Sequence, residues 1–237
     1  MPYTYDYPRP SVSVDVVVFA LDKSHKLKLL LIQRANNPYK NYWALPGGFV
    51  EMDEDLEHAA LRELEEETGV KDLFIEQLYT FGSPKRDPRG RVISIAYYAL
   101  VNLAEHQIAA SSDANNADWF DIDKLPKLAF DHQEIFKMAI YRLRGKVRYQ
   151  PIGFELLPKK FSLPQLQKLY ETILDVELNK RNFRKKILKM GFLIEVGKQK
   201  DVAHRPATLY KFDKNKYEEL LKASYDIHMR RGVDFEI

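Results

Sequence analysis

Cysteine is absent from this 237-residue chain, and its absence excludes several kinds of chemistry. The protein can have no disulfide framework, no thiolate metal site and no cysteine nucleophile. Long hydrophobic runs are also lacking near the start, where the polar segment MPYTYDYPRPS has no apolar run behind a basic stretch, so no signal peptide is expected. The apolar stretch from Val16 to Leu21 has the length of a strand and is too short to cross a bilayer. We therefore expect a cytoplasmic protein with no membrane partner.

The composition is that of an ordinary globular protein, with 45% hydrophobic and 30% charged residues. The length fits one large or two modest domains. The net charge of +3 hides an asymmetry, because residues 151–237 hold 18 Lys and Arg against 12 Asp and Glu, whereas the rest holds 19 against 22. An acidic front and a basic back suggest two separate tasks.

The segment from Gly48 to Val70, GFVEMDEDLEHAALRELEEETGV, is read as a turn, a helix and a cap. Asp53 is the expected N-cap, and Gly69 the expected C-terminal stop. Three carboxylates of the helix fall within an arc of about 100°, beside its apolar face. They belong to Glu63, Glu66 and Glu67.

Half-buried carboxylates repel one another and lose hydration, so this placement requires a compensating cation. Oxygen ligands alone suit Mg²⁺ or Mn²⁺. The alternative is a solvated acidic helix, which would explain neither the glycines nor Arg62 nor the direction in which the acids face.

These residues resemble a complete Nudix box: Gly48, Glu54, Arg62-Glu63-Leu64, Glu66-Glu67 and Gly69-Val70 stand at the family's spacing. The resemblance implies an α/β/α sandwich and hydrolysis of a nucleoside diphosphate joined to a second group. It also implies that the three carboxylates hold Mg²⁺ or Mn²⁺ with a carbonyl from Gly47 or Gly48, and that Arg62 pairs with one of them. The residues with expected catalytic roles are Arg62, Glu63, Glu66 and Glu67.

Apolar and β-branched runs predict strands around the box, with turns marked by Pro, Gly and polar residues. The expected strands cover residues 11–20, 27–32, 74–81 and 92–101, with a short extended piece from Trp119. A helix is expected from Phe130 to about Leu143, with His132 in a structural role. Residues 144–150 are interpreted as a connector, so the Nudix domain is predicted over residues 1–148 and a second domain over 149–237.

The loop SPKRDPRGR, residues 83–91, is rich in arginine, whose forked guanidinium groups suit phosphate. We expect Arg34, Arg86 and Arg89 to bind substrate; the alternative is a solvated loop. Together with WALPGGFVE and SDANNADWF, the segment resembles the ADP-ribose-handling branch of the Nudix family. The resemblance implies a further acid as catalytic base, with Asp113 and Asp118 as candidates.

The second domain is predicted to hold a helix from Leu163 to Leu174 capped by Ser162, and a basic helix from Lys180 capped by Asn179. Two strands, over 192–196 and 207–212, then enclose a polar loop. This order is typical of a winged helix-turn-helix, whose basic helix enters the DNA major groove. The alternative is a helical appendage with a solvated basic face. The predicted contacts to double-stranded DNA are Lys180, Arg181, Arg184, Lys185 and Arg205.

The whole chain, from about residue 12 to 215, resembles the two-domain Nudix-related transcriptional regulators, on its NKRNFRKK helix and RPATLYKF strand. The resemblance implies a homodimer that responds to ADP-ribose-type nucleotides or, in some lineages, to a sugar. Three hypotheses remain open: a DNA-binding regulator that binds and hydrolyses ADP-ribose or a related nucleotide, a plain Nudix pyrophosphatase with an accessory domain, and a sugar-sensing regulator without catalysis.

Overall fold

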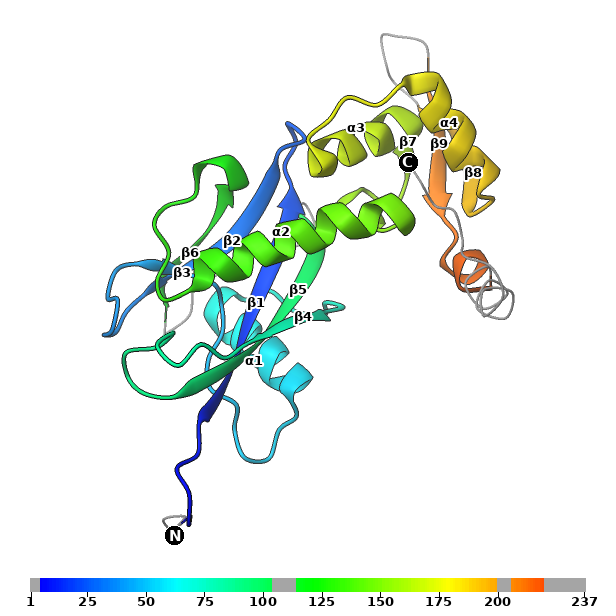
Figure 1. The fold of residues 1–237 in the computed structure, drawn as a ribbon. Coiled ribbons are helices and arrows are strands. Elements are labelled where there is room, and N and C mark those ends of the chain that lie inside the picture. Colours follow the sequence, from blue (N-terminus) through cyan, green and yellow to red (C-terminus); the bar gives the residue numbers. More distant parts are fainter. Residues whose placement is uncertain (1–4, 104–113, 200–205, 220–237) are drawn as a thin grey trace. The chain divides into compact units, whose positions relative to one another are not determined.

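A computed structural model describes residues 5–103, 114–199 and 206–219 (Figure 1). The chain divides into two compact units, one of residues 1–22 and 26–142, the other of residues 23–25 and 143–237. This division falls inside a helix, a few residues before the predicted boundary at 148/149. The two units are described separately.

The first unit is built on a six-stranded sheet in the order β3-β2-β1-β5-β4, with β6 paired to β2. The strands are β1 (Ser11–Leu21), β2 (Leu27–Arg34), β3 (Trp43–Ala44), β4 (Glu76–Phe81), β5 (Val92–Asn102) and β6 (Ala114–Asp121). Strands β1 and β5 run parallel over their whole length, and the other pairs are antiparallel. A parallel central pair is normally covered on both faces.

Helices cover both faces of this sheet, α1 (Leu56–Thr68) on one and the start of α2 (His132–Tyr149) on the other (Figure 1). From β1, Val14, Val16 and Val18 share a buried cluster with three residues of α1, namely Ala59, Ala60 and Leu64. On the opposite face, the rings of Phe19 in β1 and Phe136 in α2 lie 6.3 Å apart. Consecutive residues of β1 therefore point into two different cores, which explains its continuous apolar run.

Two local predictions are wrong. The N-cap of α1 is Asp55 rather than Asp53, because the Asp55 carboxylate accepts hydrogen bonds from the backbone N–H groups of residues 57 and 58. The predicted connector over residues 144–150 is largely the end of α2. The helix continues because Leu143 and Val147 extend its buried stripe at a spacing of four residues.

The second unit contains two helices and a three-stranded sheet in the order β7-β9-β8. Its elements are β7 (Phe161–Ser162), α3 (Leu163–Leu174), α4 (Lys180–Lys189), β8 (Leu193–Lys198) and β9 (Thr208–Phe212). Short 3-10 helices occur at η1 (Ile122–Lys124) in the first unit and η2 (Phe154–Leu156) in the second, and residues 214–219 are helical. Ser162 and Gln165 form a capping box at the start of α3.

Aromatic packing joins these elements into one core. The ring of Tyr170 in α3 lies 5.6 Å from that of Phe183 in α4, so α4 is held by its apolar face and its basic residues are left outside. Phe154 and Phe212 stack at 4.1 Å. Within the described part of the chain, no helix is long and apolar enough to cross a membrane.

Candidate functional site

A glycine turn brings the chain against β1 at the start of the box. The backbone N–H groups of Val14 and Val16 donate to the carbonyls of Gly48 and Pro46, each at 2.9 Å. Gly47 has φ +152°, and a Cβ there would collide with the carbonyl of Val14. Only glycine fits so close an approach without strain.

Two carboxylates of α1 lie against this turn. The Glu67 carboxylate accepts the N–H of Gly47 at 2.8 Å and is buried, and burial raises its pKa to about 8. The Glu63 carboxylate lies so close to Gly48 that a Cβ there would overlap it. Burial also raises the pKa of Glu63, despite its hydrogen bond from Arg62. In both groups the charged form is therefore not fully compensated by its surroundings.

Arg62 donates hydrogen bonds to three acids of the box, whereas the resemblance implied a pair with one carboxylate. Its Nε and Nη2 donate to the two oxygens of Glu54 at 2.9 and 2.6 Å, and its Nη1 donates to Glu63 at 2.9 Å and to Glu66 at 3.3 Å. The hydrogen bonds from Arg62 lower the pKa of the Glu54 carboxyl to about 2. The hydrogen bonds with Glu54 and Glu63 in turn raise the pKa of Arg62. Glu54 is the best-compensated of these acids.

The donor set suits a divalent cation only in part. Glu63 and Glu67 fit, since each is an oxygen donor with uncompensated charge beside the glycine turn. The side chain of Glu66 is 56% exposed and turned to Arg62. Accordingly, no three His, Cys, Asp or Glu side chains gather into a metal-binding group among the residues that the structure describes. The Gly48 carbonyl already accepts from Val14 but retains a second lone pair.

Arg34 and Arg89 lie near each other beside the box. Burial, and then the charge of Arg89, lower the pKa of Arg34, whose Nε donates to the carbonyl of Pro38 at 3.0 Å. Arg89 makes a two-pronged pair with Asp87, and 43% of its side chain is exposed. Two guanidinium groups placed this close favour an anion between or beside them.

Arg86, in contrast, is enclosed by the protein. Its guanidinium donates to both oxygens of Asp131, at 2.9 and 2.7 Å, and to Asp15 at 3.3 Å, with 4% of the side chain exposed. These partners anchor the loop between β4 and β5, residues 82–91, to β1 and to the start of α2. The structure therefore favours a positioning role for Arg86 over the predicted contact with substrate.

Asp15 is the centre of this network, which the sequence analysis missed. Besides Arg86, its carboxylate accepts the hydroxyl of Ser94 at 2.5 Å and lies 3.3 Å from Nε2 of His132. The Nδ1 of His132 accepts the N–H of Leu45 at 2.9 Å, just ahead of the glycine turn. One signal was visible: an aspartate inside the β-branched run SVSVDVVVFA is unusual, because buried carboxylates require partners.

Of the two candidates for a catalytic base, Asp118 lies within the described residues. Asp118 lies on β6 opposite Leu31, and its exposed carboxylate accepts the N–H of Trp119 at 2.7 Å. Asp113 lies outside the described residues.

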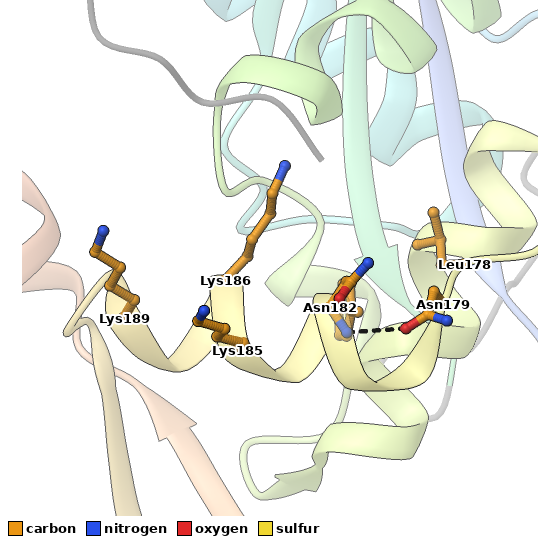
Figure 2. A pocket seen from close by; sticks show the side chains of 7 residues that line it. Leu178, Asn179, Asn182, Lys185, Lys186 and Lys189 are labelled. Atoms are coloured by element: carbon orange, nitrogen blue, oxygen red, sulfur yellow. Dashed lines mark hydrogen bonds between the residues drawn. The ribbon is translucent and has the colours of Figure 1, made fainter.

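A second candidate site is the basic helix α4. All six of its Lys and Arg residues are exposed, including the predicted contacts Lys180, Arg181, Arg184 and Lys185. A hollow of about 490 Å³ lies along one side of this helix, and Figure 2 shows side chains that line it. It is lined by Leu178, Asn179, Asn182, Phe183, Lys185, Lys186 and Lys189. Of the predicted contacts, only Lys185 lines it, and Arg205 lies outside the described residues.

Asn179 sets the start of this helix. Its side chain accepts the N–H groups of Arg181 and Asn182, at 3.1 and 3.0 Å. The cap orders the first turn, where two of the predicted contacts lie.

Comparison with known proteins matches both units. Residues 10–139 match the NUDIX domain, and residues 153–212 match the NrtR DNA-binding winged helix domain. The chain is 39% identical, over 90% of its length and 86% of the relative's, to the ADPR responsive transcriptional repressor NtrR of Acinetobacter baylyi. It is also 46% identical, over 55% of its length and 73% of the relative's, to an ADP-ribose pyrophosphatase of Methanocaldococcus jannaschii.

Among solved structures, the chain resembles Shewanella oneidensis NrtR complexed with a 27mer DNA. The TM-score is 0.76 at 35% identity, covering 87% of this chain and 95% of that one. The predicted architecture, a mixed α/β Nudix fold followed by a smaller winged helix-turn-helix, is thereby confirmed.

Proposed function

The chain belongs to the family that joins a NUDIX domain to an NrtR-type DNA-binding winged helix, and from this premise we propose that it is a transcriptional regulator whose Nudix domain binds and hydrolyses ADP-ribose or a closely related nucleoside diphosphate. The observation that carries the proposal is the under-compensated carboxylate pair Glu63 and Glu67 against the glycine turn. Carboxylates whose charged form lacks compensation can hold the divalent cation that metal-assisted hydrolysis requires. The names of the two relatives support the choice of nucleotide.

In this proposal, Glu63, Glu66 and Glu67 hold Mg²⁺ or Mn²⁺, assisted by the Gly48 carbonyl. When bound, such an ion supplies positive charge to the diphosphate and promotes attack by water. Arg62 keeps Glu63 in position through its hydrogen bond, whereas Glu66, which is exposed and turned to Arg62, would have to leave this partner to reach the ion.

Recognition of the diphosphate is assigned to Arg34 and Arg89. Both guanidinium groups lie beside the box, and Arg89 is partly exposed while still held by Asp87. Arg86 contributes by fixing the 82–91 loop through Asp131 and Asp15. Water is consumed and one phosphate–oxygen bond is broken, so ADP-ribose yields AMP and ribose 5-phosphate.

The second unit is proposed to bind double-stranded DNA through Lys180, Arg181, Arg184 and Lys185 on α4, with Arg205 at the wing. We propose that the protein acts in the cytoplasm as a homodimer that spans two half-sites of a palindrome, as helix-turn-helix dimers do. The exposed charge of α4 supports DNA as the partner over a plain hydrolase with an accessory domain.

The hydrolase activity is tested by incubating purified protein with ADP-ribose and Mg²⁺ or Mn²⁺ and measuring AMP. We expect release of AMP, and loss of most of it in Glu67→Gln, because a neutral amide does not offset the charge of the metal. A matched control is Glu65→Gln, since Glu65 lies on the same helix, exposed, and pairs with Lys71 at 3.7 Å. If the intact protein releases no AMP from ADP-ribose or related nucleotides with either metal, the enzymatic part of the proposal fails and the regulatory part remains.

A further inference from the structure

Two segments of the chain connect the two compact units. One is the tip of the β1–β2 hairpin, residues 23–25, which belongs to the second unit although both strands belong to the first. The other is α2, which begins in the first unit and lies in the second from Leu143 onward. These two segments are the covalent routes by which a change in one unit can reach the other.

Both segments contact the same end of α3. The hydroxyl of Thr172 donates to the carbonyl of His25, in the hairpin tip, at 2.9 Å. The Nε of Arg144, in α2, donates to the carbonyl of Ile173 at 3.0 Å. All four residues belong to the second unit. Two segments that are far apart in the sequence therefore hold adjacent residues in the last turn of one helix, and the cation lies where the helix dipole favours it.

The hairpin tip is held in an uncommon conformation. His25 has a φ angle of 59°, and a positive φ is uncommon in residues other than glycine. The Nδ1 of its ring is buried and has no hydrogen-bond partner within the described part of the chain. A buried polar atom without a partner costs free energy. The contact with Thr172 therefore holds the tip in an arrangement that its surroundings do not fully satisfy, as is expected of an element with a second arrangement.

Helix α3 in turn holds the segment that starts α4. The side-chain amide of Gln167 donates to the carbonyl of Leu178 at 2.9 Å, and the carboxylate of Glu171 accepts the N–H of Leu178 at 3.1 Å. The same amide donates to Glu171 at 2.9 Å, which fixes both side chains. Leu178 directly precedes Asn179, the N-cap of α4 (Figure 2). A shift of α3 therefore changes where the basic helix begins.

The two connecting segments are also joined inside the first unit. Arg86 donates to Asp15 in β1 at 3.3 Å, and at 2.7 Å to Asp131, which directly precedes α2. Arg86 lies in the same loop as Arg89, to which recognition of the diphosphate is assigned. A ligand that moves this loop therefore acts on β1 and α2 together, because closely packed elements shift as units and do not deform continuously.

We propose that α3 is the element through which nucleotide binding changes DNA affinity: the hairpin tip and the end of α2 act on Thr172 and Ile173, and the bonds from α3 to Leu178 pass the shift to the start of α4. The inference rests on the proposed function and deepens it by assigning the regulation of DNA binding to named contacts. A ligand shifts an equilibrium only through its differential affinity for the two states. Removing the contacts should therefore reduce the coupling and leave each ligand bound as before.

The test measures a coupling factor, the ratio of the affinities for DNA from upstream of the protein's own operon without and with the α,β-methylene analogue of ADP-ribose, which resists hydrolysis. For the wild type we expect a factor of about 5 to 150. Thr172→Val removes the hydroxyl donor at nearly constant shape, and Arg144→Met removes the guanidinium. Each should bring the factor toward one, by about 2- to 30-fold. The affinity for DNA alone and for the analogue alone should stay unchanged.

Three variants serve as controls for these substitutions. Thr172→Ser retains the hydroxyl and should retain the wild-type coupling factor, which a role of Thr172 in packing alone would not require. Arg148→Met changes an exposed arginine of α2, and Thr80→Val changes an exposed threonine of β4. Both should also keep the wild-type factor.

The proposal is overturned if Thr172→Val and Arg144→Met both keep the wild-type factor, including the case in which they weaken DNA binding equally with and without the analogue. If one variant does not fold, the other decides, because the two contacts come from different segments. A wild-type factor of one would instead contradict the regulatory part of the proposed function, and this inference with it.

Discussion

Glu67 is the most deeply buried carboxylate of the box. It is buried, it accepts a single backbone hydrogen bond, and its pKa is raised to about 8 by the loss of hydration. A bound cation would stabilise the charged form of this carboxylate, so folding and metal binding are linked at this residue.

Metal should therefore stabilise the protein through Glu67. With Mg²⁺ at 100 times its dissociation constant, the free energy of unfolding should rise by about 2.7 kcal/mol, and this gain should be largely lost in Glu67→Gln. Glutamine retains an acceptor for the N–H of Gly47, so the fold itself should persist. Urea denaturation with Mg²⁺ and with EDTA measures the gain, and Glu65→Gln should keep it. An undiminished gain in Glu67→Gln would exclude Glu67 as a ligand.

His132 makes a separate prediction about pH. Complete burial lowers the pKa of its imidazole, although the charges of Asp15 and Asp131 oppose this shift. Since its pKa in the folded protein lies below the usual 6.5, the unfolded chain binds the proton first as pH falls. The free energy of unfolding should therefore decrease as pH drops below 6.5.

The variant His132→Asn isolates this effect, because asparagine can still accept the N–H of Leu45 but does not titrate. The difference in unfolding free energy between wild type and variant should shrink as pH falls from 7.5 to 5.5. His58→Asn is a contrasting control, because pairing with Asp55 raises the pKa of the exposed His58 and gives the opposite sign. A difference that stays constant with pH would show that the pKa of His132 is the same in the folded and the unfolded protein.

At the scale of elements, α4 combines a buried face with a charged one. Phe183 and Ile187 anchor it, and its basic residues lie exposed. A helix with six cations and no acid in ten residues is electrostatically unfavourable without an anionic partner.

DNA binding should depend on this helix and on salt. If six to ten phosphates are contacted, affinity should fall by about 10³- to 10⁵-fold from 50 to 200 mM salt. Arg184→Ala should cost ~1–3 kcal/mol at one base position, or reduce the salt slope by about one if Arg184 meets phosphate. Lys168→Ala, at an exposed lysine on α3, should change neither quantity. Equal effects of the two substitutions in anisotropy titrations would place the interface elsewhere.

The elements with strong local signals were the ones that could be predicted from sequence. The bounds of α3 follow from the Ser162 cap and an apolar stripe, and the start of α4 from Asn179. The end of α2 was missed because the segment RGKVRYQ is polar on average. Only the four-residue spacing between Leu143, just before this segment, and Val147 within it reveals a buried face. The two-residue strand β7 is too short to have a pattern.

For the candidate site, the sequence was informative where the motif is contiguous. It placed Glu67, Glu63 and Arg62 together, since one helix and one turn carry them. It could not find the partners of Arg86, because Asp15 is 71 and Asp131 is 45 positions away. Nor could it distinguish the buried Arg86 from the partly exposed Arg89 in one loop, since burial is decided by tertiary packing.

At the scale of the whole molecule, a NUDIX domain and a DNA-binding winged helix domain occur in one chain, which divides into two compact units. A ligand changes DNA affinity only if it binds the DNA-incompetent state more tightly than the DNA-competent one. Linkage then requires that DNA lower the affinity for the ligand by the same factor. This reciprocity separates a regulator from a hydrolase that happens to adhere to DNA.

The most direct measurement is the affinity of the protein for labelled DNA from upstream of its own operon, with and without saturating ADP-ribose. Glu66→Gln is used to prevent turnover, since Glu66 is exposed and its loss should leave the fold intact. We predict sequence-selective binding that ADP-ribose weakens by about 5- to 150-fold, a matching loss of ADP-ribose affinity when DNA is bound, and no effect of pentose sugars. Release by a sugar alone, unchanged affinity at saturating ADP-ribose, or no sequence-selective binding at any salt concentration would contradict the account.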